Sequence, residues 1–266
     1  SPLNTQTMFV DTHCHLDASE FDDTQPELVI SAKQAGVNCI VVPSVTLANF
    51  DIVKQLCAQH PGCVPAYGIH PMYTDKAHPD DLIPLLDYLV LPDTVAVGEI
   101  GLDFFVDHYD RACQEHYFVA QLKLAVEFDL PVLLHIRRAQ DTILKHLRQY
   151  KVRGGIAHAF NGSRQQADEF IKLGFKLGFG GAMTYSRATR LRELAATLPL
   201  ESIVLETDAP DIPPDFLERG QPNKPEYLPR IAQTLADLRG MPVNEIANAT
   251  TQNVISVLPK LGNLIS

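Results

Sequence analysis

The segment Phe9-Val10-Asp11-Thr12-His13-Cys14-His15 is an apolar run near the N-terminus that ends in a His-x-His motif. Side chains alternate between the two faces of a β-strand, so we expect His13 and His15 to point one way and Cys14 the other. Two imidazoles at the end of one strand can bind a divalent metal ion. The motif alone is weak, because such pairs also occur by chance. Its meaning depends on where the other histidines and acidic residues fall.

The chain has the composition of an ordinary globular protein. It contains 266 residues, of which 45% are hydrophobic and 20% are charged, with 15 Gly and 19 Pro. That is ample material for a hydrophobic core, and an α/β barrel of about 250 residues forms a single domain. We therefore predict one domain over residues 8–266, with residues 1–7 as a tag or a disordered N-terminus.

Charge, cysteine content and hydropathy limit the classes of protein. No apolar run approaches the roughly 18 residues of a membrane span, so we expect a cytoplasmic protein without membrane contact or an obligate protein partner. The five cysteines are scattered without a Cys-x-x-Cys motif, which argues against disulfides and a thiolate zinc site. The net charge of -10 disfavours general attraction to polyanions, but bound cations invert local charge, so a nucleic-acid substrate is not excluded.

Eight short runs of β-branched and other apolar residues recur along the chain. They are Met8–His13, Asn38–Pro43, Val64–Ile69, Val95–Ile100, Val132–Ile136, Gly155–Phe160, Phe175–Gly180 and Ile203–Thr207. Continuous apolar runs of this kind are typical of parallel strands that are buried on both faces.

Segments with helical periodicity separate and follow these runs. They are Pro26–Ala35, Leu47–His60, Asp80–Leu91, Asp110–Phe128, Thr142–Tyr150, Arg164–Leu173, Arg187–Leu198, Pro225–Arg239, a short Pro242–Thr250 and Asn253–Leu258. Eightfold alternation of strand and helix predicts the α/β class and a single (β/α)₈ TIM barrel. A doubly wound open sheet is the alternative, but it needs fewer strands and a Gly-rich turn where His13-Cys14-His15 stands.

Potential metal ligands recur at the predicted C-terminal ends of the strands. They are His13 and His15, His70, Glu99 and Asp103, His135, His158, and Glu206 and Asp208. In a parallel barrel these ends form one rim, where barrel enzymes hold their active sites. Each residue alone could cap a turn or pair within the core. A buried carboxylate is costly unless it is paired or binds metal, so the whole set indicates a functional site.

Imidazole and carboxylate ligands without thiolate suit Zn, Mn, Ni, Fe or, with more oxygen ligands, Mg. The four histidines His13, His15, His135 and His158, with Glu99 and Asp208, suffice for two divalent ions (Mg, Mn, Zn or Ni) that share Glu99 as a bridge. Such a pair would bind a phosphate diester and lower the pKa of a water molecule. Asp208 would be both a ligand and the base that takes the water's proton.

Five motifs in combination make the sequence resemble the TatD-type metal-dependent deoxyribonucleases, a branch of the amidohydrolase-like TIM barrels. The likeness runs from Asp11 to about Val257. The motifs are Asp11-Thr12-His13-Cys14-His15, Gly68-Ile69-His70-Pro71, Gly98-Glu99-Ile100-Gly101-Leu102-Asp103, His158-Ala159-Phe160-Asn161-Gly162 and Glu206-Thr207-Asp208-Ala209-Pro210. The segment Gln221–Leu228 is similar to the Asn/Pro-rich loop of the family.

The resemblance implies hydrolysis of DNA phosphodiester bonds, typically from the 3′ end, with single-stranded DNA or 3′ ends as the substrate. It implies metal binding by His13, His15, Glu99, His135, His158 and Asp208. It also implies catalytic roles for Asp208, Glu99 and His70, and substrate contacts by His70, Asp103 and Glu206.

The chain departs from the family pattern near the expected substrate path. Arg137 is followed by Arg138-Ala139-Gln140, and Phe104-Phe105 stands where tyrosine is common. Phe104, Phe105 and Tyr185 either stack on bases or pack within loops, and packing is the favoured interpretation. Five arginines on the rim side either clamp phosphates or are solvated; they are Arg137, Arg138, Arg164, Arg187 and Arg190. We assign Arg137 to substrate binding.

Two other functions stay open. The first is a hydrolase of a small phosphoester, lactone or amide on the same barrel; such enzymes often carry a modified lysine on the fourth strand, where this chain has Glu99. The second is a metal-binding scaffold without turnover. The identity of the metal, DNA versus RNA, exonuclease versus endonuclease action and the oligomeric state are left undecided by the sequence.

Overall fold

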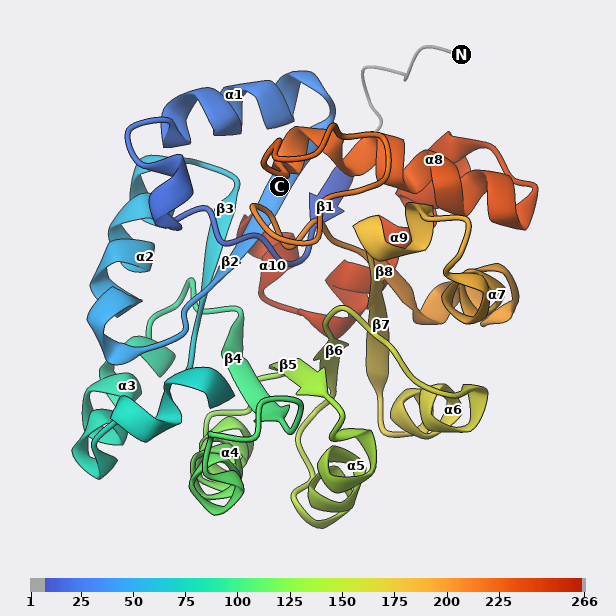
Figure 1. The fold of residues 1–266 in the computed structure, drawn as a ribbon. Coiled ribbons are helices and arrows are strands. Elements are labelled where there is room, and N and C mark those ends of the chain that lie inside the picture. The colour runs from blue at the N-terminus through green and yellow to red at the C-terminus, as the bar shows by residue number, and fades with distance from the viewer. Residues whose placement is uncertain (1–7, 265–266) are drawn as a thin grey trace.

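The computed structural model describes residues 8–264 and contains eight parallel strands in sequential order. The predicted tag or disordered segment, residues 1–7, lies outside the described residues. The strands are β1 Phe9–Asp11, β2 Val37–Pro43, β3 Cys63–Tyr67, β4 Ala96–Asp103, β5 Val132–Arg137, β6 Gly155–Ala157, β7 Phe175–Phe179 and β8 Ile203–Leu205. They form a nearly closed barrel, which confirms the predicted fold (Figure 1).

Helices α1 to α8 form an outer ring around the strands (Figure 1). The helices are α1 Gln25–Gln34, α2 Leu47–Gln59, α3 Leu82–Leu89, α4 Arg111–Glu127, α5 Gln140–Gln149, α6 Arg164–Lys172, α7 Thr189–Thr197, α8 Leu228–Arg239, α9 Val243–Val257 and α10 Leu261–Leu264. Among the described residues, none of these helices combines the length and the apolar character that crossing a bilayer requires.

Every strand except β7 contributes to two hydrophobic cores, which explains the continuous apolar sequence of these strands. In β2, Ile40 and Val42 belong to the large core shared with the surrounding helices, whereas Cys39 and Val41 belong to a smaller second core. Alternate residues of a strand point to opposite faces, so a strand buried on both faces has no polar positions in between.

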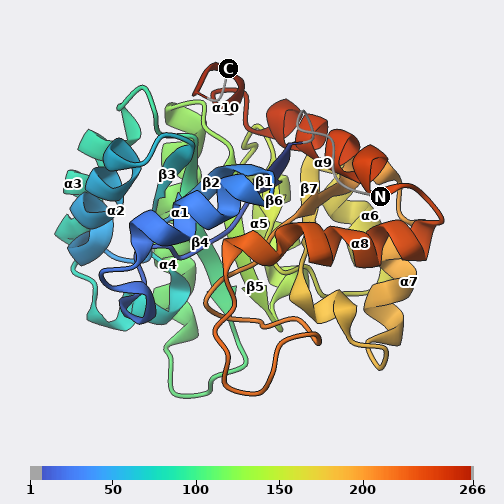
Figure 2. The same cartoon turned by 90° about the horizontal axis from the view of Figure 1, so that it is seen from above.

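The second core closes one end of the barrel. Val254 and Val257 of α9 and Leu261 of α10 pack in it with strand residues such as Val10 and Val41. Figure 2 shows α10 at this end and the loops that follow β4 and β8 at the opposite end. One end of the barrel is therefore sealed by the C-terminal helices, and the other is left to the loops.

The C-terminal helices differ from the prediction in one respect. The sequence predicts separate helices over Pro242–Thr250 and Asn253–Leu258, but α9 is continuous over Val243–Val257. The Thr250 hydroxyl donates to the Ile246 carbonyl one turn earlier at 2.7 Å, so the polar side chain at the predicted end bonds back into the helix and does not end it.

Asn253 fastens α9 to the start of β8. Its amide donates to the carbonyl oxygens of Leu200 and Ile203, both at 2.8 Å, and the side chain is buried. We expect Asn253→Ala to lower the free energy of unfolding by about 2 kcal/mol, because two buried acceptors lose their donor. Urea denaturation measures this loss. Gln252→Ala, at an exposed neighbouring position, is the control and should change stability by less than about 0.5 kcal/mol. Equal effects of the two substitutions would contradict the assignment.

Candidate metal centre

The contacts that join the last strand to the first also bring two predicted ligands together. The main-chain N–H of Thr12 donates to the Leu205 carbonyl at 3.1 Å, and that of Asp208 donates to the His13 carbonyl at 2.7 Å. The sequence predicted that His13 lies within the first strand. Strand β1 ends at Asp11, however, so His13 follows the strand. The seam between β8 and β1, rather than strand periodicity, places His13 beside Asp208.

Glu99 lies at the centre of the cluster and is almost completely buried. The register between β4 and β5 shifts between Val97 and Ile100, and the Glu99 N–H donates instead to the Ser44 carbonyl of the loop after β2 at 2.9 Å. Irregularities of this kind re-aim side chains near active sites. Here the carboxylate lies within 4 Å of imidazoles from the ends of β1, β3, β5 and β6.

One oxygen of Glu99 faces the His-x-His motif. Oε1 lies 3.1 Å from Nε2 of His13 and 3.5 Å from Nε2 of His15. Oδ1 of Asp208 faces the same two nitrogen atoms and lies 3.4 Å from Nε2 of His15 and 3.7 Å from Nε2 of His13. These four side chains form a first set of potential ligands.

The second oxygen of Glu99 faces a different set of imidazoles. Oε2 lies 3.3 Å from Nδ1 of His135, 3.4 Å from Nε2 of His70 and 3.9 Å from Nε2 of His158. The last of these atoms is also 3.6 Å from Oδ1 of Asp208. The two oxygens of one carboxylate thus face two sets of nitrogen atoms.

These side chains fit a divalent cation. Oδ1 of Asp208 is buried and makes no hydrogen bond among the described residues, although imidazole nitrogens of His13, His15 and His158 lie 3.4 to 3.7 Å away. Nitrogen and oxygen ligands about 2.0–2.1 Å from one ion lie roughly 3–3.5 Å from each other. The spacing is too wide for hydrogen bonds and close to that of ligands around a shared ion.

Asp103 lies behind His135. The Nε2–H of His135 donates to Asp103 Oδ2 at 2.8 Å, which leaves Nδ1 facing Glu99. Gly101 makes this approach possible, because its φ is +151° and a Cβ there would lie 1.9 Å from the His135 carbonyl oxygen.

Glu206 lies behind His158 in the same way. The Nδ1–H of His158 donates to Glu206 Oε2 at 2.9 Å, and the Ala159 N–H donates to Oε1. A Cβ at Gly178 would lie 2.5 Å from Glu206 Oε2, so this glycine leaves room for the carboxylate.

Asp103 and Glu206 are each 1% exposed, and each holds one imidazole with its free nitrogen toward the cluster. Carboxylate–histidine pairs of this kind orient metal ligands and raise their basicity. The sequence predicts substrate contacts for both residues. Their position behind the histidines favours positioning of the ligands instead.

His70 differs from His135 and His158 in that its protonated ring nitrogen faces the cluster. Its Nδ1 accepts a hydrogen bond from the Met72 N–H at 3.1 Å, so in the neutral ring the proton is on Nε2, which faces Glu99. Burial lowers the pKa of His70 to about 4 despite the nearby Glu99 carboxylate, which keeps the ring neutral near pH 7. His70 is therefore suited to donate a hydrogen bond at the site rather than to ligate metal.

The charges in the cluster favour a cation. Burial alone would raise the pKa of Glu99, but the imidazoles of His13 and His70 outweigh it and hold the pKa well below its ordinary value. Burial alone would lower the pKa of His15, but the carboxylates of Asp208 and Glu99 outweigh it and raise the pKa to about 9. The ionised carboxylates of Glu99 and Asp208 thus stand beside the protonated imidazole of His15, and a metal ion would displace that proton.

A cavity of about 1150 Å³ opens over the cluster, and its rim is divided by charge. The cationic side chains come from the end of β5 and from the segments after β3, β5 and β7, whereas the acidic ones come from the segments after β1 and β8. The cations are Lys76, Arg137, Arg138 and Arg190, and the acids at the rim are Asp17, Glu20 and Asp211. Two predicted arginines lie elsewhere: Arg164 binds Asp168 and Thr197 on α6 and α7, and Arg187 lies over Tyr185 beside an adjoining cavity.

The three rim aromatics take different positions. Phe104 is partly buried against the core, and the Tyr185 hydroxyl donates to a loop carbonyl, so both pack as the favoured interpretation had it. Phe105 is 42% exposed and lines the cavity. The guanidinium carbons of Arg137 and Arg138 lie 3.7 and 4.6 Å from the centre of its ring.

Two residues to which the sequence analysis gave no role make hydrogen bonds that fix the backbone around His13 and Asp208. Asp11 is fully buried and accepts hydrogen bonds from the Thr207 N–H, the Thr207 hydroxyl and the His13 N–H. Burial raises its pKa to about 7, against the effect of these hydrogen bonds. Asn223 is also buried, and its amide donates to the carbonyls of Thr207 and Asp211. Both lie in motifs that carry the family resemblance, which was the available signal.

An eight-stranded parallel barrel with imidazoles and carboxylates gathered at its C-terminal rim is the arrangement of a metal-dependent hydrolase of the TIM-barrel class. The family model for TatD related DNases matches residues 10–259. The chain belongs to this family, as its motifs predicted.

Two bacterial relatives cover nearly the whole chain. The metal-dependent hydrolase YjjV of Escherichia coli is 42% identical over 253 residues, which are 94% of this chain and 97% of that protein. The crystal structure of YjjV superposes on this chain with a TM-score of 0.91, and the match covers 94% of this chain and 98% of the YjjV chain. The 3′-5′ ssDNA/RNA exonuclease TatD of Citrobacter rodentium is 34% identical over 249 residues, which are 91% of this chain and 95% of that protein.

The tautomer of His70 leads to a test that separates it from the predicted ligands. We expect His135→Ala to lower Zn²⁺ or Mn²⁺ affinity by more than about 100-fold, because it deletes a nitrogen that faces Glu99. His70→Ala should keep the metal content of the unaltered protein. Titration calorimetry of metal-stripped protein and elemental analysis after dialysis measure both. Equal loss of metal from the two variants would make His70 a ligand.

Proposed function

We propose that this metal-dependent hydrolase cleaves DNA phosphodiester bonds, acting from 3′ ends with two divalent ions. The observation that carries the proposal is the position of the Glu99 carboxylate, whose two oxygens face two separate sets of imidazole nitrogens. A carboxylate placed in this way suits a bridge between two ions. The proposed ligands are His13, His15, Glu99, His135, His158 and Asp208.

The residues of the chain support distinct steps of hydrolysis. Divalent ions held here would polarise a phosphoryl oxygen and lower the pKa of a water molecule. Asp208 is suited to take the proton of that water because it is ionised, since His158 and the other imidazoles lower its pKa against the effect of burial, and because Oδ1 has no hydrogen-bond partner within residues 8–264. His70 is suited to donate its Nε2–H to a phosphoryl or leaving oxygen beside Glu99.

The cationic part of the rim supports a nucleic-acid substrate. Arg137 and Arg138 are exposed, line the cavity over the cluster and flank Phe105. Guanidinium groups bind phosphates, and an exposed aromatic ring beside them is a common device for stacking bases of single strands. On this part of the rim, cationic side chains therefore offset the overall negative charge of the chain. The Citrobacter rodentium relative, named a 3′-5′ ssDNA/RNA exonuclease, adds support.

The acidic part of the rim supports a second candidate, a hydrolase of a small phosphoester, lactone or amide. Asp17, Glu20 and Asp211 line the cavity on the loops after β1 and β8, where a long polyanion would be repelled. A strand that ends at the cluster avoids this side, so the proposal for DNA requires action at an end. A scaffold without turnover is disfavoured because the predicted ligands converge.

Metal-stripped protein should cleave 3′-labelled single-stranded DNA after Mg²⁺, Mn²⁺ or Zn²⁺ is added, and a circular single strand should resist. Glu99→Ala should lower the rate by at least about 10³-fold, because both sets of nitrogens lose the carboxylate between them. Gel electrophoresis of the products measures the rates, and circular dichroism checks that the variant is folded. Turnover of a small phosphotriester or lactone, without DNA cleavage by any metal, would reverse the ranking of the two candidates.

Removal of the Arg137 guanidinium from the rim should weaken the binding of long substrates more than that of short ones. We expect Arg137→Ala to raise KM for a single-stranded oligonucleotide about tenfold and for a small chromogenic phosphodiester about twofold or less, because only the oligonucleotide reaches the rim. Arg164→Ala is the control. It also removes one arginine, but Arg164 binds Asp168 and lines neither cavity, so this substitution should leave both KM values unchanged. Equal increases for the two substrates would argue against a phosphate clamp at Arg137.

A further inference from the structure

A second cavity, of about 480 Å³, adjoins the one over the cluster. It lies between the loops after β6, β7 and β8, at the end of β7. The two cavities share part of their lining, namely Ala159, Asn161, Arg190, Asp208 and Ile212. The two cavities therefore lie next to each other at the rim.

The lining of the side cavity is mostly apolar. Phe160, Phe179, Leu191 and Ile212 contribute, with glycine and alanine between them. Its volume falls within the range of cavities that bind small organic groups, and such cavities combine apolar walls with a few polar groups.

The polar lining of the side cavity offers both hydrogen-bond donors and acceptors, and it includes Glu206, Thr207 and Asp208 on the β8 side. The Arg190 guanidinium donates to the side-chain oxygen of Asn161 at 3.3 Å, and the Gln140 amide donates to the Asn161 carbonyl. Arg187 and Thr189 also line the cavity. Apolar walls with such an edge suit a flat heterocycle with polar atoms on its rim better than a charged phosphate, which would lose its hydration against the walls.

We propose that the side cavity binds the base of a nucleotide next to the scissile phosphate. This inference rests on the proposed function, because only a nucleic-acid substrate brings a base within reach. The cationic rim would then hold the phosphates, while the side cavity holds one base and fixes the register of the strand over the cluster.

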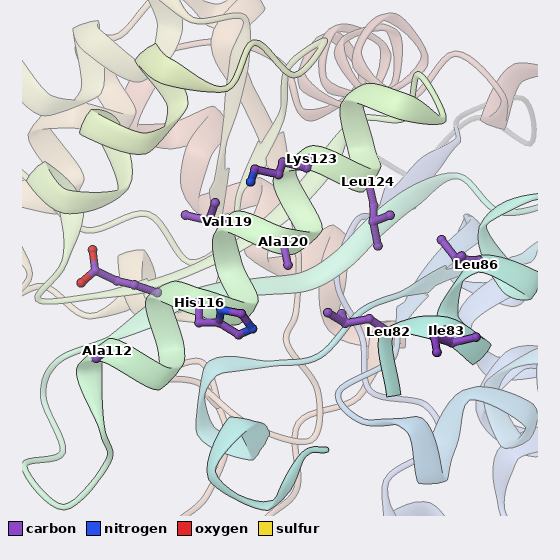
Figure 3. Close-up of a pocket in the computed structure, with 10 residues that line it drawn as sticks. Leu82, Ile83, Leu86, Ala112, His116, Val119, Ala120, Lys123 and Leu124 are labelled. Carbon is purple, nitrogen blue, oxygen red and sulfur yellow. The ribbon is translucent and has the colours of Figure 1, made fainter. Parts of the chain in front are cut away.

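A groove elsewhere on the barrel provides a control. It lies on the outer surface, where Leu82, Ile83 and Leu86 of α3 face α4 (Figure 3). Ala112 and Ala120 of α4 line it as well, and it shares no lining residue with either cavity at the rim. A bulky side chain placed there tests the effect of the substitution itself.

The test compares oligonucleotides that carry all their bases with oligonucleotides that carry a tetrahydrofuran residue on the 5′ or the 3′ side of the scissile bond. In the unaltered protein, loss of the base on one of these sides should lower kcat/KM about tenfold. Ala182→Phe, at an exposed position that lines the side cavity, should lower kcat/KM for the intact substrate by a similar factor and abolish the difference between substrates. Thr189→Phe fills the cavity from α7 and should do the same.

Ala112→Phe in the outer groove should keep both the rate and the difference between the substrates. Cleavage by the unaltered protein without a penalty for either missing base, or a penalty that persists in both Ala182→Phe and Thr189→Phe, would overturn the side-cavity proposal alone. Failure of the unaltered protein to cleave any DNA with any metal would overturn the proposed function and this inference together.

Discussion

The closure of the barrel at the seam between β8 and β1 is the contact on which the site depends. Asp11 is buried there and accepts hydrogen bonds from both the N–H and the hydroxyl of Thr207, which lies 196 positions further along the chain. The neighbouring bond from the Asp208 N–H to the His13 carbonyl places two potential ligands side by side. One set of contacts thus closes the fold and assembles the first half of the cluster, so fold and function are not separable at this point.

Around that seam the structure buries five carboxylates, those of Asp11, Glu99, Asp103, Glu206 and Asp208. Glu99 and Asp208 lie among imidazoles, whereas Asp103 and Glu206 each hold one imidazole from behind. Isolated buried charges cost several kcal/mol, so this grouping is stable only because opposite charges or donors meet every carboxylate. The same arrangement attracts divalent cations, since the free nitrogen of each oriented histidine already faces the centre.

Much of this arrangement was predictable. The continuous apolar runs indicated buried parallel strands, and the histidines and acids at the strand ends indicated where a site would form. The roles of Asp103 and Glu206 were not predictable, because they depend on close approach at Gly101 and Gly178, which only packing reveals. The break expected between Thr250 and Asn253 was wrong for a related reason. The side chain of a threonine in a helix can hydrogen-bond to a carbonyl one turn earlier, as Thr250 does, or compete with the helix and end it, and local sequence does not decide which.

The sequence by itself determined the order of strands and helices, the end of the barrel that carries the chemistry and the residue types that meet there. These follow from hydropathy and from the chemical nature of each side chain, which are local properties. Only the tertiary structure decided which nitrogen of each histidine faces the cluster, which part of the rim is cationic and that a second cavity adjoins the first. Those features depend on distances between residues far apart in the chain, and such distances exist only after the barrel has closed.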